Sequence, residues 1–240
     1  IAQGYNIAAY GTIDLIKDST ITAGQYALNN SAVITELNNC TFTAHPDSAQ
    51  VNTYGTTSAN VQGNVQCYTI YNSSAWWYDS TVWKRTDTTS SPYTRTDEYK
   101  EDTACRPTIA RIIDCNISAE NTSTSADHGC ALYNTGGIIG TIGGTTEIKT
   151  YKHPDNAKSI ASCYALRNTG GGIIRSIEGS VTISASGYSA IYNDGQFTTK
   201  TVNKYSDKIG GIQLSNNTTY GEPSEITSIT ATGTISAGSY

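Results

Sequence analysis

An aromatic cluster is the part of the sequence whose residue types could best bind a ligand. Trp76, Trp77, Tyr78 and Trp83 lie in the segment WWYDSTVWKR, which holds every tryptophan of the chain. Aromatic rings stack on sugar rings and anchor protein interfaces, so these four residues are a candidate site for surface glycans or for a receptor. The alternative is that the rings form the small core of a loop subdomain.

Groups that could perform catalysis do not converge in the sequence. His45, His128 and His153 are far apart, and the acidic residues are scattered along the chain. Polysaccharide lyases and hydrolases need clustered carboxylates or a calcium site, and no serine–histidine–aspartate set can be assigned. We therefore expect no catalytic residue, no metal site and no cofactor, and a polysaccharide-degrading enzyme remains the third alternative.

The composition favours strands and sets two classes of partner aside. Threonine, serine, asparagine, glycine and 17 tyrosines suit pleated sheets and tight turns, and no segment is typical of an amphipathic helix. The net charge is −5 and no basic cluster occurs, so nucleic acid is not an expected partner. Apolar runs are only a few residues long, so no membrane span is expected.

Two sequence motifs recur along the chain. The first is Ile-x-x-Ile followed by Ile-x-Ala, as in IDLIKDSTITA (13–23), ITELNNCTFTA (34–44) and ITSITATGTISA (226–237). The second is an Ala-Leu or Ala-Ile pair followed by Asn and Gly, as in ALYNTGG (131–137) and AIYNDG (190–195). Alignment of the second motif places four asparagines at one position: Asn30, Asn134, Asn168 and Asn193.

Stacked copies of this repeat predict an all-β fold, a right-handed parallel β-helix. Stacking at about 4.8 Å aligns the isoleucines into a continuous core, and it aligns the asparagines into a hydrogen-bonded ladder. A two-sheet sandwich is the alternative, but it gives no reason for aligned Asn and Gly columns. We expect rungs over residues 1–44, a Trp- and Tyr-rich insertion over 45–106, and rungs of the same solenoid over 107–240.

Six cysteines without a Cys-x-x-Cys pair are typical of structural disulfides in an oxidising compartment. Cys40 and Cys115 occupy the same motif position, which puts their Cα atoms within disulfide range in stacked rungs. Two buried free thiols are the alternative for this pair. The predicted bonds are Cys40–Cys115, Cys67–Cys105 and Cys130–Cys163.

At AIYNDG and GTISAG the chain resembles repeat-rich bacterial cell-surface proteins of the adhesin-like kind. The resemblance covers residues 1–44 and 107–240, and it implies a cell-surface or extracellular location with a passive or adhesive role. No polar cap is evident at either end of the repeat region. We therefore expect either a slice of a longer surface stalk or a filament subunit that binds itself end to end through its terminal rungs.

Overall fold

The computed structural model describes residues 3–7, 11–44, 67–73, 78–85, 93–101, 106–121, 129–152, 164–186, 189–194, 200–208, 211–220 and 224–237. For 3–7, 78–85, 93–101, 200–208 and 211–220, and for residues 121, 129 and 152, it describes the path of the backbone alone. Within these ranges the chain forms three parallel sheets of six strands and one antiparallel sheet of four strands.

The strands of the three parallel sheets follow one another in strict rotation. Sheet A contains β1 (Gln3–Ile7), β4 (Tyr26–Asn30), β7 (Cys67–Ser73), β12 (Gly129–Thr135), β15 (Tyr164–Thr169) and β18 (Ser189–Asn193). Sheet B contains β2 (Thr12–Lys17), β5 (Val33–Asn38), β10 (Thr108–Ile113), β13 (Ile138–Gly143), β16 (Ile173–Ile177) and β21 (Glu225–Ile226). Sheet C contains β3 (Thr20–Ala23), β6 (Thr41–Ala44), β11 (Asn116–Asn121), β14 (Glu147–Lys152), β17 (Thr182–Ala185) and β22 (Ile235–Ala237).

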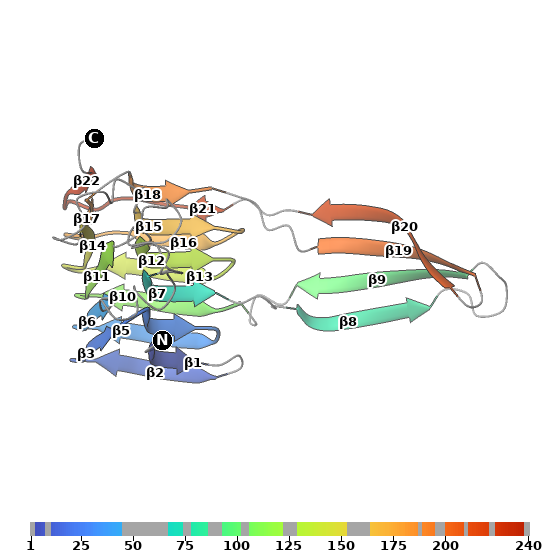
Figure 1. Ribbon diagram of the computed structural model, residues 1–240, viewed down its shortest axis with the longest axis horizontal. Helices are drawn as coiled ribbons and strands as arrows, with labels where there is room; N and C mark the ends of the chain where they lie inside the picture. Colours follow the sequence, from blue (N-terminus) through green and yellow to red (C-terminus); the bar gives the residue numbers. More distant parts are fainter. Residues whose placement is uncertain are drawn as a thin grey trace, which may run out of the picture.

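Each turn of the solenoid, or rung, takes one strand from each sheet, and the rungs stack in chain order (Figure 1). Rung 1 is β1–β2–β3, rung 2 is β4–β5–β6, and rung 3 is β7–β10–β11. Rung 4 is β12–β13–β14, rung 5 is β15–β16–β17, and rung 6 is β18–β21–β22. The prediction of a parallel β-helix is confirmed.

The core of the solenoid consists of apolar columns that run from rung to rung. The first column holds Ile13, Ile34, Ile109, Ile139, Ile174 and Ile226. The second holds Ile16, Leu37, Ile112, Ile142, Ile177 and Ile229, and the third holds Ile21, Phe42, Ile117, Ile148, Ile183 and Ile235. Members in rungs 2 to 5 are fully buried, because each is covered by the rung above and the rung below.

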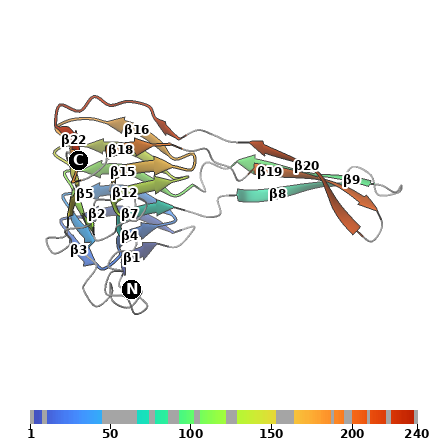
Figure 2. The same cartoon turned by 45° about the horizontal axis from the view of Figure 1, so that its top comes forward.

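A four-stranded antiparallel sheet, here called the arm, extends away from the solenoid (Figures 1 and 2). Its order is β20 (Gly211–Tyr220), β19 (Lys200–Lys208), β9 (Tyr93–Glu101) and β8 (Tyr78–Arg85). The β8–β9 hairpin leaves rung 3 between sheets A and B, and the β19–β20 hairpin leaves rung 6 at the same corner. Pairing of β9 with β19 joins the two excursions into one sheet.

The domain boundaries differ from those expected from the sequence. The segment 45–106 is not one insertion, because it contains β7, which pairs in parallel with β4 and β12 as a rung strand. The segment 107–240 is not all rungs, because β19 and β20 belong to the arm. The strand β7 (CYTIYNS) has Thr-Ile in place of the Ala-Leu pair and lacks the Gly after Asn, and these two departures from the motif concealed it.

Candidate functional site

The aligned asparagines form one continuous ladder at the corner between sheets A and B. Each Nδ2 donates to the Oδ1 of the asparagine in the next rung, over 2.7 to 2.8 Å. The ladder joins Asn30, Asn72, Asn134, Asn168 and Asn193, and the first four are fully buried. Alignment of the sequence missed Asn72 because its strand, β7, departs from the recognised motif.

The same amide groups also close the corner of their own rung. Nδ2 of Asn134 donates to the Gly137 carbonyl over 3.0 Å, and Nδ2 of Asn168 donates to the Gly172 carbonyl over 2.8 Å. A Cβ atom at Gly137 would lie 2.4 Å from Nδ2 of Asn72. The corner glycine is therefore required by the close approach of the ladder, while positive φ is taken by its neighbour Gly136.

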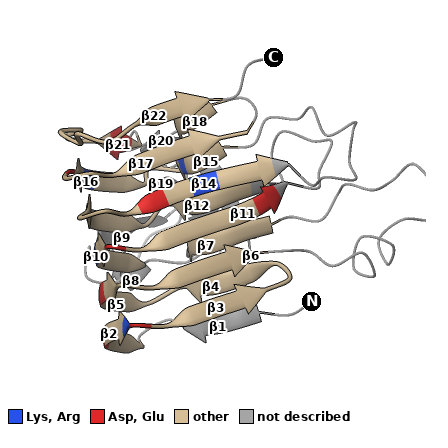
Figure 3. Ribbon diagram, turned by 90° about the vertical axis from the view of Figure 1, so that its left-hand side faces the viewer, with Lys and Arg blue, Asp and Glu red and all other residues tan. Residues whose placement is uncertain are grey.

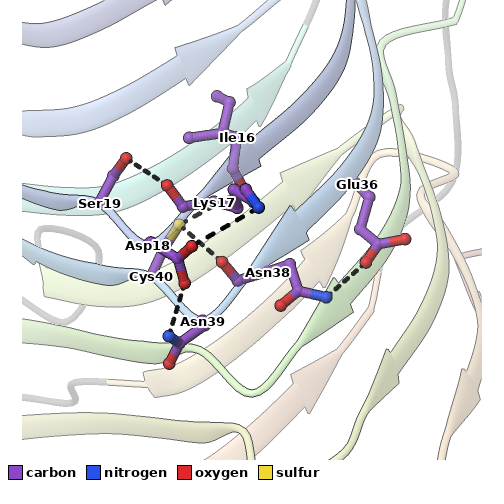
Figure 4. A network of polar contacts seen from close by, with 8 residues as sticks. All are labelled: Ile16, Lys17, Asp18, Ser19, Glu36, Asn38, Asn39 and Cys40. Carbon is purple, nitrogen blue, oxygen red and sulfur yellow. Dashed lines mark hydrogen bonds and ion pairs between the residues drawn. The ribbon is translucent and has the colours of Figure 1, made fainter.

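The corner between sheets B and C contains a second column of left-handed residues. Asp18, Asn39 and Asp114 have φ of 49°, 50° and 54°, and Gly144 and Gly179 follow in rungs 4 and 5. Short polar side chains tolerate this conformation because they bond locally. Nδ2 of Asn39 donates to Oδ1 of Asp18 over 2.7 Å (Figure 4).

The predicted Cys40–Cys115 disulfide is wrong: both residues are buried free thiols. They occupy equivalent inward positions in rungs 2 and 3. Parallel side chains at the rung spacing of about 4.8 Å hold the Cβ atoms beyond the roughly 3.8 Å usual for a disulfide. Each thiol instead donates to backbone carbonyls, and Sγ of Cys40 lies 3.2 Å from the Asn38 carbonyl (Figure 4).

The other two predicted disulfides are not formed within the described residues. Cys67 is a buried free thiol, so its bond to Cys105 is wrong, and Cys105 itself lies outside the described residues. Sγ of Cys130 donates to the Leu132 carbonyl over 3.1 Å. Its predicted partner Cys163 also lies outside the described residues.

The native protein is expected to protect Cys67 and Cys115 from alkylation by iodoacetamide at pH 8. Burial raises the pKa of both thiols to about 12, so the reactive thiolate is scarce, whereas an unfolded thiol has a pKa of about 8.5. Mass spectrometry after alkylation in buffer and in urea measures the difference. Equal labelling in both conditions, or recovery of a Cys40–Cys115 disulfide peptide, would contradict the conclusion that these cysteines are buried free thiols.

Half of the predicted aromatic site lies outside the described residues. Trp76 and Trp77 are outside the described residues. Tyr78 and Trp83 belong to β8 on the edge of the arm, where Trp83 is the backbone partner of Asp97 on β9. The structure thus places two members of the predicted site on the arm.

A second aromatic surface, missed in the sequence, lies outside the core on sheet A. Tyr71 and Tyr133 are half-buried and point away from the core, because their neighbours Ile70 and Leu132 face inward. The surface is here called the tyrosine ridge, and it comprises Tyr26, Tyr68, Tyr71, Tyr133, Tyr164 and Tyr192 with Arg167. Within the contacting pairs of rings, the centroids lie 4.6 to 6.0 Å apart.

The two hairpins of the arm return to the solenoid at one shared residue, Gly171. Arg106, which follows β9, is 1% exposed, and its Nη2 donates to the Gly171 carbonyl over 2.9 Å. The Gly171 N–H donates to Oγ of Ser224, which follows β20, over 3.0 Å. Arg106 thus extends from rung 3 to rung 5. These contacts anchor both hairpins to the shaft.

The apolar columns end exposed at rung 6. The side chains of Ile229 and Ile235 are 48% and 46% exposed, whereas the residues below them, Ile177 and Ile183, are fully buried. The unpaired edges of β18, β21 and β22 border these side chains. This face of rung 6 therefore presents both backbone hydrogen-bonding groups and apolar side chains to a further rung.

Comparisons with known proteins do not relate the chain to a characterised group. No family model matches it, and no curated protein or solved structure is significantly similar to it. In the described part of the chain, no helix is long and apolar enough to cross a membrane. The described residues also hold no group of three or more His, Cys, Asp or Glu side chains arranged for a metal ion.

Proposed function

We propose that the protein is an extracellular structural or adhesive shaft that lengthens by end-to-end stacking of its solenoid. Matching of the two end rungs is the observation that supports this proposal. Ile21 and Ala23 on β3 occupy the same columns as Ile235 and Ala237 on β22. A second copy placed on rung 6 continues these columns and covers the exposed isoleucine.

In sheet B, the apolar residues of rung 1 and rung 6 also occupy the same columns. Ile13 and Ile16 on β2 belong to the columns that end in Ile226 and Ile229 in rung 6. Stacking of rung 1 on rung 6 would bury the exposed Ile229 side chain beneath Ile16. The gain is about 25 cal/mol for each Å² of apolar surface removed from water.

The terminal strands of sheet C lack the usual protection of exposed sheet edges. Natural edges carry charged residues, proline or bulges that block further pairing. Neither β3 (TITA) nor β22 (ISA) contains a charge or a proline. Charged residues are sparse over the whole of this sheet, as Figure 3 shows. Contacts that repeat head to tail without closing produce open fibres.

Ile235→Asp is expected to abolish end-to-end assembly, because it places a carboxylate in the column that the next copy must cover. Sedimentation velocity over a range of concentrations measures the assembly state. The wild type should form polymers whose size grows with concentration, while the variant stays monomeric and keeps its strand content by circular dichroism.

Ser236→Asp is the matched control, because it adds the same charge one residue along, on the outer side of β22. It should assemble like the wild type or nearly so. A wild type that remains monomeric at every concentration would overturn the proposal. Equal assembly by the Ile235→Asp variant would also overturn it.

A further inference from the structure

The tyrosine ridge brings phenol rings from adjacent rungs into direct contact. Tyr26 in rung 2 and Tyr71 in rung 3 are stacked, with ring centroids 5.5 Å apart and planes 19° apart. Tyr71 and Tyr133 in rung 4 lie 5.4 Å apart. Tyr164 in rung 5 and Tyr192 in rung 6 lie 4.6 Å apart. The contacts therefore connect strands that are far apart in the sequence.

The fold holds these rings in place. Tyr71 and Tyr133 are direct backbone partners in sheet A, and the asparagine that follows each of them belongs to the buried ladder. A fixed register keeps neighbouring rings at the rung spacing, which raises their effective concentration toward one another far above that of two separate molecules. Tyr26, Tyr71, Tyr133 and Tyr192 are half-buried, so a one-electron oxidant can reach them from solvent, and the buried Tyr164 contacts Tyr192.

We propose that the tyrosine ridge is a site of oxidative cross-linking, where a haem peroxidase with hydrogen peroxide converts neighbouring tyrosines into dityrosine. Each of two phenols gives up one hydrogen atom, as a proton and an electron, from its O–H group. The two phenoxyl radicals form one carbon–carbon bond between the ring positions ortho to oxygen. The hydrogen on each coupled carbon then returns to the phenol oxygen. Hydrogen peroxide takes up the two electrons and two protons and becomes two water molecules.

Arg167 divides the ridge into two groups. Its guanidinium lies 4.8 Å from the Tyr133 ring centroid and 5.7 Å from those of Tyr164 and Tyr192. In the register of sheet A it takes the place that Tyr71, Tyr133 and Tyr192 hold in rungs 3, 4 and 6. Cross-links should therefore join rungs 2 to 4 to one another and rung 5 to rung 6, but not rung 4 to rung 5.

Such bonds would fasten neighbouring rungs covalently along sheet A. The described part of the chain contains no disulfide that does so. The inference rests on the contacts between the rings and does not require end-to-end stacking of the solenoid.

The test uses the full chain at a concentration where it is monomeric, treated with a haem peroxidase and hydrogen peroxide. Digestion and mass spectrometry identify peptide pairs that are joined with the loss of two hydrogen atoms. We expect links of Tyr71 to Tyr26 or Tyr133, and of Tyr164 to Tyr192, at about tenfold or more the yield obtained in urea. The monomer band should persist on a denaturing gel.

Three variants distinguish cross-linking within the tyrosine ridge from general oxidation of tyrosines. Tyr71→Phe should remove the links made by residue 71 and leave the Tyr164–Tyr192 link, while Tyr192→Phe should do the reverse. Arg167→Tyr should create a new link between rungs 4 and 5. Links only between molecules, equal yields in urea, or equal coupling of the exposed Tyr151 outside the ridge would overturn the proposal.

Discussion

Replacing Asn134 by alanine is expected to destabilise the solenoid by about 4 kcal/mol. Its Oδ1 accepts from Asn72 and its Nδ2 donates to Asn168, so the change removes one of the bonds that Nδ2 of Asn72 donates and leaves Oδ1 of Asn168 without its donor. The Gly137 carbonyl loses a donor as well. Each buried group left without a partner costs about 1–3 kcal/mol. Equilibrium unfolding in urea, followed by circular dichroism, measures the loss.

Asn193→Ala is the matched control for this prediction. Asn193 is the last member of the ladder and is exposed, so water can replace the hydrogen bonds that its side chain makes. Its removal should cost about 1 kcal/mol. Similar losses at the two positions would show that the ladder is not a cooperative buried network.

Arg106→Ala is expected to cost about 3–5 kcal/mol, comparable to the truncation of a large core aromatic residue. Arg106 is among the largest fully buried side chains, and it donates to the carbonyl of Gly171, whose N–H donates to Ser224 after β20. The variant should lose the anchor of the arm before the rungs unfold. Limited proteolysis with trypsin should therefore cut within β9 or β19 faster than in the wild type.

Arg111→Ala provides the control for the removal of an arginine. Arg111 pairs with Glu36 over 3.2 Å, but its side chain is 56% exposed. Exposed ion pairs contribute about 0.2–1 kcal/mol. If Arg106→Ala and Arg111→Ala have equal effects on stability and on proteolysis, Arg106 does not anchor the arm.

Local repetition explains why much of the fold could be predicted from the sequence. The motif that ends in Ile-x-Ala marks sheets B and C, and the Ala-Leu-x-Asn motif marks sheet A, so both follow from residues close together in the chain. The strand β7 has Thr69-Ile70 where the motif has Ala-Leu, and Ser74 stands where the motif continues to Gly, so it was assigned to the insertion. The arm could not be predicted because pairing of β9 with β19 joins strands about a hundred residues apart.

The cysteines and the tyrosine ridge show two further limits of sequence reasoning. Cys40 and Cys115 share a column, as alignment predicts, but alignment does not show that parallel Cβ vectors keep the sulfur atoms from bonding. The ridge arises from outward positions, which repeats leave variable. A Tyr directly before the ladder Asn in β7, β12 and β18 was the signal available in the sequence.

The axial repeat of the assembled protein, measured by electron cryo-microscopy, tests end-to-end stacking most directly. The six rungs of the described residues, at about 4.8 Å each, predict an arm that recurs about every 29 Å along a filament one solenoid wide. Dispersed short rods at high concentration, or filaments with an unrelated axial repeat, would contradict the proposed shaft.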